Sequence, residues 1–172
     1  MESNLKRTGI AMAALFIAGL GVGPAQAGGV VTTSLFLPLQ GTVVAPGDPC
    51  RENVPLGGMV HVVSIVPPSP ITPPSPIKLH FNMAGVLGTG ETSGNTYIAT
   101  GAAQVDIVPP SPIVPPNPIV PPSPIFQLEG TGSCAGQAQL PVSFNLLFDQ
   151  SGHLLPSSSA TFGQCSVDHP CQ

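Results

Sequence analysis

The stretch IVPPSPITPPSPI occupies residues 65–77, and a longer relative, IVPPSPIVPPNPIVPPSPI, occupies residues 107–125. Each tract repeats a six-residue unit in which a proline recurs at every third position. Proline fixes φ near about −65° and restricts the residue before it, so both tracts are predicted to be polyproline II-like. No glycine lies inside either tract, which excludes a collagen triple helix.

Isoleucine holds a fixed position in this repeat. Because polyproline II has three residues per turn, the third-position prolines line one edge, and isoleucines alternate with further prolines along a second edge. Two apolar edges out of three favour a self-association surface over a solvated spacer. The candidate interaction residues are Ile65, Ile71, Ile77, Ile107, Ile113, Ile119 and Ile125.

Outside the tracts, several segments alternate apolar and polar residues, a period that is typical of half-buried strands. The predicted strands cover residues 30–40, 59–65, 78–83, 95–99, 126–129, 140–148, 153–155 and 160–165, with a hairpin turn at 149–152. We therefore predict an all-β fold, a single antiparallel β-sandwich or barrel with two polyproline II-like tracts inserted between strands. Whether each tract folds back as a hairpin loop or crosses from one end of the domain to the other stays open.

The first 27 residues have the features of an export signal. Lys6 and Arg7 precede an apolar run at residues 10–22, and Ala25-Gln26-Ala27 matches a small-x-small cleavage site. The run is too short for a comfortable membrane span. We expect a β-domain of residues 28–172 that is secreted, periplasmic or at the cell surface, with no membrane span after cleavage.

Few charges remain after this cleavage. Two basic residues stand against seven acidic ones, a net charge of about −5. No basic patch is available to neutralise phosphates, so nucleic acid is excluded as a partner.

Four cysteines follow the signal, which fits an oxidising compartment. Four cysteines allow three pairings. We favour Cys50 with Cys165, which ties the two ends of the domain, and Cys134 with Cys171. The alternative is free or locally paired thiols near the tail.

Catalytic and metal-binding motifs are weak in this chain. The sequence GSCAG at 132–136 matches the Gly-x-Cys-x-Gly pattern of a nucleophile elbow with cysteine as the nucleophile. That motif needs a strand before it and a helix after it. We therefore favour a turn that holds a disulfide cysteine. The four histidines (His61, His80, His153 and His169) lack close metal-ligand spacing. We predict no catalytic residues, no metal and no cofactor.

The run GTGETSGNTYIATGA at 88–102 resembles a segment of small exported bacterial β-proteins of uncharacterised function. An early cysteine (Cys50), the Phe126–Gly130 strand and a late cysteine (Cys165) extend the resemblance over residues 50–165 outside the tracts. It implies export and a β-fold, and it brings no active site. The tracts, Cys134 and Cys171 depart from the pattern.

Two functions are compatible with these features. The first is a non-enzymatic structural or interaction protein of the cell surface or extracellular space. Its tracts would act as spacers or would bind other copies or another surface protein. The second is a monomeric ligand-binding β-domain with expanded proline loops. The tracts are alternatively tolerated repeat expansions without a function of their own.

Overall fold

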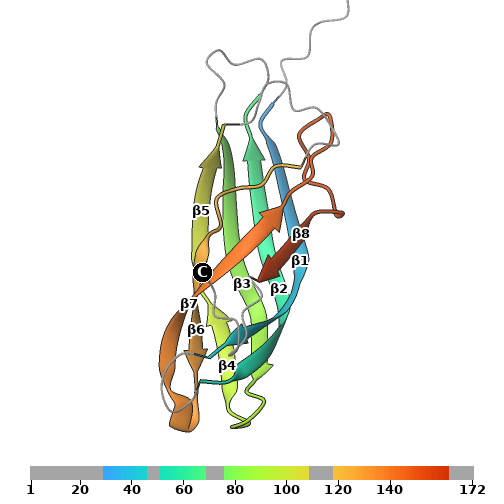
Figure 1. Ribbon diagram of the computed structural model, residues 1–172. Coiled ribbons are helices and arrows are strands. Elements are labelled where there is room, and N and C mark those ends of the chain that lie inside the picture. Colours follow the sequence, from blue (N-terminus) through green and yellow to red (C-terminus); the bar gives the residue numbers. More distant parts are fainter. Residues whose placement is uncertain (1–28, 46–50, 69–75, 109–117, 163–172) are drawn as a thin grey trace, which may run out of the picture.

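A computed structural model describes residues 29–45, 51–68, 76–108 and 118–162. Eight strands and one short 3-10 helix, η1, make up its regular structure (Figure 1). They are β1 (Val31–Val44), β2 (Asn53–Val66), β3 (Ile77–Thr89), β4 (Thr96–Thr100), β5 (Ala102–Ile107), β6 (Ile125–Gly130), η1 (Gly132–Cys134), β7 (Gly136–Asn145) and β8 (Ser159–Phe162).

The strands form one antiparallel sheet in the order β1-β2-β3-β4-β6-β7-β8, and β5 pairs with β3 beside β4. The sheet curls until β8 lies next to β1, where a Cβ on Gly41 would be 3.1 Å from the Phe162 ring. The result is an antiparallel sheet that is nearly closed into a barrel. This confirms the predicted all-β antiparallel fold.

Alternation along each strand fills the interior of the barrel. In β7, Leu140, Val142 and Phe144 are buried, while the residues between them are exposed. Phe144 meets Phe81 of β3 across the interior, with ring centroids 4.2 Å apart. Side chains from opposite walls therefore pack against each other and form the core.

Strand β3 is long enough to pair with two successive strands on one side. Its second half pairs with β4 and its first half with β5, and Gly101 joins these two partners. Gly101 has φ of +116°, a conformation that favours glycine, and its carbonyl accepts a hydrogen bond of 3.1 Å from the Met83 N–H. β4 and β5 are thus one strand interrupted by a glycine kink.

Most of the predicted strands overlap observed ones. The predicted face of Val142, Phe144, Leu146 and Phe148 is buried as expected. The turn at 149–152 is present, and Phe148 bridges Leu154 across it. β5 was not predicted, and β1, β2 and β3 are longer than predicted.

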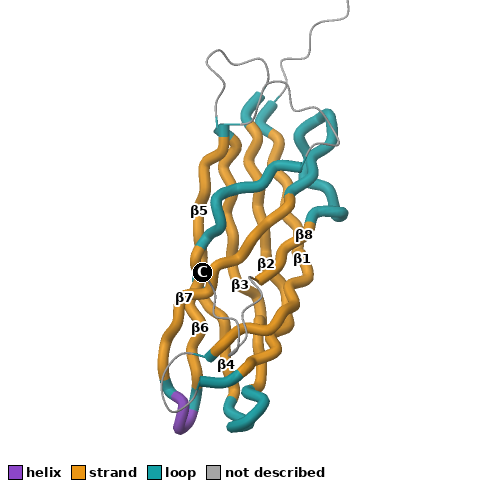
Figure 2. The backbone as a smooth tube through the Cα atoms, viewed as in Figure 1, coloured by secondary structure: helices purple, strands orange, loops and turns teal. Residues whose placement is uncertain are grey.

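Loops gather at the two ends of the barrel (Figure 2). Within the described ranges, no helix is long and apolar enough to cross a membrane. The expected signal segment, the middle of each proline tract and residues 163–172 lie outside the described residues.

Candidate interaction surface

The two ends of the first proline tract and the start of the second lie at the same end of the barrel. Ile65 pairs with Lys78, which joins the end of β2 to the start of β3 across the first tract. Ile77 pairs with Ile107, which places the start of the second tract beside the end of the first. This is the upper end in Figure 1. The described ends of the first tract therefore lie side by side on neighbouring strands, as the ends of a loop between β2 and β3 do.

The last repeat of the second tract lies against the barrel. The Ile119 N–H donates to the Leu146 carbonyl at 2.8 Å, and the Leu146 N–H donates back to the Ile119 carbonyl at 3.0 Å. Further along, the Val142 N–H donates to the Pro124 carbonyl at 3.1 Å. Pro121 and Pro124 are buried. This repeat is therefore part of the domain and runs alongside β7.

The sheet is not continuous beside the last repeat of the second tract, between β5 and β6. The ladder between β4 and β6 ends at the pair Thr100 and Gln127. If the register of this ladder continued, residues 120–125 would lie opposite residues 102–107 of β5. Prolines lack the N–H of a ladder, and the three-residue period of polyproline II does not match the two-residue period of a strand. Residues 118–124 diverge from β5 and run from the end of β7 to the start of β6 (Figure 1). Among the described residues, β3 is the only strand that pairs with β5.

The tract isoleucines do not share one environment. Three of them pack in or against the core of the barrel, namely Ile77, Ile107 and Ile119. Ile65 is half-buried on the outer face of β2, and Ile125 of β6 is 53% exposed. Ile71 and Ile113 lie outside the described residues. Ile77, Ile107 and Ile119 thus stabilise the strands, whereas Ile125 leaves apolar surface exposed on the outer face of β6.

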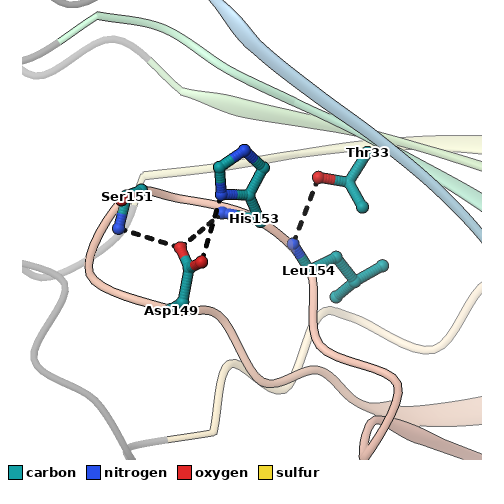
Figure 3. A network of polar contacts seen from close by, with 5 residues as sticks. All are labelled: Thr33, Asp149, Ser151, His153 and Leu154. Carbon is teal, nitrogen blue, oxygen red and sulfur yellow. Dashed lines mark hydrogen bonds and ion pairs between the residues drawn. The ribbon is translucent and has the colours of Figure 1, made fainter.

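A polar turn lies at the same end of the barrel (Figure 3). One oxygen of Asp149 accepts hydrogen bonds of 2.8 Å from the N–H groups of Ser151 and His153, and the other lies 3.1 Å from the His153 Nδ1. The backbone N–H of His153 is the main cause that lowers the Asp149 pKa, and the partial burial of the carboxyl opposes it. The Leu154 N–H donates to the Thr33 Oγ1 at 3.3 Å, which fixes the turn on β1.

The opposite end of the barrel is organised around a buried carboxylate. Glu52, which directly precedes β2, is only 4% exposed. Its carboxylate accepts hydrogen bonds of 2.8 Å from the N–H groups of Thr92 and Ser93, a short one from the Ser93 hydroxyl, and one of 3.0 Å from the Tyr97 hydroxyl. A Cβ on Gly90 would collide with this carboxylate. The β3–β4 hairpin is therefore built around the side chain of Glu52.

These hydrogen bonds determine the charge state of the site. The Ser93 hydroxyl, followed by the Ser93 N–H, lowers the Glu52 pKa from 4.5 to about 2, against an opposing effect of burial. Burial, followed by the Glu52 carboxylate, raises the pKa of Tyr97. A carboxylate that stays ionised and already accepts four hydrogen bonds is suited to holding a loop and is poorly suited to proton transfer.

The candidate cysteine elbow lies at this end too. Residues 132–136 join β6 to β7, with Cys134 in η1, so no helix follows the cysteine as a nucleophile elbow requires. The Asn95 Nδ2 donates to the Ser133 Oγ at 3.3 Å and connects this turn to the β3–β4 hairpin. Cys50, Cys165 and Cys171 and the side chain of Cys134 lie outside the described residues, so the two pairings stay predictions.

A shallow groove of about 360 Å³ runs across the outer face of β2, β3 and β5. Its polar lining comes from His61, His80, Asn82 and Gln104. The ring of Phe36, which is 57% exposed, stacks on His61 with centroids 4.6 Å apart. Among the described residues, no cluster of three or more His, Cys, Asp or Glu side chains is arranged to hold a metal ion. The groove offers polar side chains, with the Phe36 ring beside them.

No family model, curated protein or solved structure matches this chain. The sequence does not single out Glu52, because its partners Ser93 and Tyr97 lie more than forty residues away along the chain. Its only signal is a lone acidic residue in a chain with few charges. Asp149 and His153 had a clearer signal, because Asp-x-Ser-Gly is a common turn sequence.

Proposed function

We propose that this protein is a non-enzymatic, exported interaction protein. Its β-barrel presents two proline-rich tracts from one end, where they act as self-association or spacer elements. The mature chain starts near Gly28, and its partners are other copies or another surface protein.

One observation carries this proposal. The anchors of both tracts, at the pairs Ile65 with Lys78 and Ile77 with Ile107, are neighbours on one sheet. Two tracts that start from one site can contact a partner together, and the second contact then benefits from the high effective concentration that the first one creates.

The burial of the tract isoleucines supports two different roles within each tract. Ile77, Ile107 and Ile119 pack in or against the core, whereas Ile71 and Ile113 lie between the anchored ends along the chain. The anchors therefore belong to the fold, and the middle of each tract is the part that contacts a partner. The hydrogen-bonded state of Glu52 supports a structural role for the most perturbed acid of the described residues.

The test replaces residues 69–75 and 109–117 by glycine-serine segments of equal length, which leaves the anchors in place. We expect a lower average mass in light scattering and a retained β-sheet signal in far-UV circular dichroism. A double variant, Ile71→Ser with Ile113→Ser, keeps every proline and should reproduce the loss if the apolar edge matters. An average mass equal to that of the unmodified chain in both variants would refute the proposal.

A ligand-binding domain is the second candidate, and the outer groove favours it. His61, Asn82 and Gln104 line the groove, and the exposed Phe36 ring stacks on His61 beside it. Together they suit a small, neutral, hydroxylated ligand that stacks on an aromatic ring. A screen of neutral saccharides by ligand-observed NMR, with Phe36→Ala as the control, tests this. If the saccharide signals change equally with the unmodified protein and with Phe36→Ala, the ligand-binding candidate is rejected. It is also rejected if the signals do not change when protein is added.

A further inference from the structure

Among the described residues, strand β5 pairs with β3 along one edge and with no strand along the other. The Met83 N–H donates to the Gly101 carbonyl, and the register then directs the backbone groups of Ala103, Val105 and Ile107 toward β3. The N–H and C=O groups of Ala102, Gln104 and Asp106 point the other way. Within the described ranges, no backbone group bonds to them.

The edge lacks most of the features that protect exposed strands. Natural edge strands are blunted by prolines, bulges or several charges. β5 contains no proline, and Asp106 is its only charged residue. Its inward-facing Ala103, Val105 and Ile107 are only half-buried, so the core itself is incompletely covered along this side.

We infer that this edge pairs with the same edge of a second copy of the chain, so that β5 and its counterpart form one continuous antiparallel ladder. A two-fold axis at Gln104 places Gln104 opposite Gln104 of the partner subunit. It also places Ala102 opposite Asp106 of the partner subunit, and the reverse. All three residues present their backbone groups to the interface, which allows up to about six hydrogen bonds. The partner strand must turn away after Asp106 of the partner subunit, because β6 pairs with Thr100 and occupies the next part of this edge.

This register is self-complementary on both faces of the sheet. On the inner face, Ala103 meets Val105 of the partner subunit, so two half-buried apolar surfaces cover each other. On the outer face, the two Asp106 carboxylates are about 14 Å apart along the ladder, and each has Lys78 as its neighbour on β3. No like charges are opposed, and a second copy therefore fits this edge better than an arbitrary peptide does.

The inference does not depend on the proposed role of the tracts, and the experiment separates the two. Gln104→Lys and Gln104→Glu each place like charges opposite each other at the two-fold axis, and each should weaken dimerisation about tenfold in sedimentation equilibrium. A mixture of the two variants should restore dimers as a heterodimer. Gln139→Lys, the same change at an exposed position inside the sheet on β7, is the matched control and should leave the dissociation constant unchanged.

A second variant tests the backbone directly. Gln104→Pro removes an N–H that makes no bond to β3, so the circular dichroism spectrum should be retained while dimerisation weakens at least tenfold. The glycine-serine tract variant should still dimerise. The inference is overturned by a chain that stays monomeric at millimolar concentration, or by Gln104 variants that dimerise as the unmodified chain does.

Discussion

The docking of the last proline repeat on β7 has a consequence that two adjacent residues can test. Ile119→Pro removes the N–H that donates to the Leu146 carbonyl at 2.8 Å and shortens a half-buried side chain. Val120→Pro is the matched change. The Val120 N–H has no hydrogen-bond partner among the described residues, and its side chain is 68% exposed. Both positions already lie in a proline-rich, extended setting.

The magnitude follows from these contacts. An unsatisfied buried carbonyl costs about 1–3 kcal/mol, and the lost part of the Ile119 side chain about 1 kcal/mol, so Ile119→Pro should lower the free energy of unfolding by about 2–4 kcal/mol. For a domain of this size that corresponds to a fall in Tm of about 4–16 °C. Val120→Pro should change the free energy by less than about 0.5 kcal/mol.

Urea and thermal unfolding followed by far-UV circular dichroism measure both variants, since the chain has no tryptophan. Equal losses of stability in the two variants would refute the account, because the repeat would then not be held through Ile119. The absence of any loss in Ile119→Pro would mean that the whole tract is detached from the domain.

Three further predictions concern the interior and the Glu52 site. Because the Glu52 pKa is lowered from 4.5 to about 2, its contribution to stability is complete above about pH 4.5 and is lost as the pH falls toward 2. Glu52→Gln should therefore flatten the dependence of Tm on pH in this window, and an unchanged slope would contradict the assignment. Phe144→Ala should cost about 3–5 kcal/mol in urea unfolding, whereas Phe36→Ala at an exposed position should cost little; similar losses would show that the core is misplaced. Gly90→Ala should lower Tm by displacing the Glu52 carboxylate, whereas Gly57→Ala, with open space around it, should not; a Tm equal to that of the unmodified chain in Gly90→Ala would contradict the packing of the hairpin.

The strands that were predicted from the sequence are those in which apolar and polar residues alternate regularly. Residues 140–148 combine alternating large apolar side chains with a turn sequence directly after them, and the structure confirms their buried face. β5 was missed because its sequence, AAQVDI, has two alanines and an aspartate in six residues, and its inner face is only half-buried. Its strand conformation comes from pairing with β3, which local sequence does not report.

The proline tracts show a related limit. Their repeat predicts an extended conformation, but the pairing of Ile65 with Lys78 depends on strands that lie on either side of the first tract. The choice between a loop and a crossing is therefore a property of the sheet. The Glu52 site depends on contacts between residues forty positions apart, and no local pattern predicts it.

Light scattering on the mature chain, residues 28–172, over a wide concentration series tests the central claim most directly. If the tracts bind other copies, the average mass should rise with concentration beyond that of a dimer, because tract contacts add to any pairing through β5. A mass that stays at that of a monomer or dimer across the whole series would contradict self-association through the tracts.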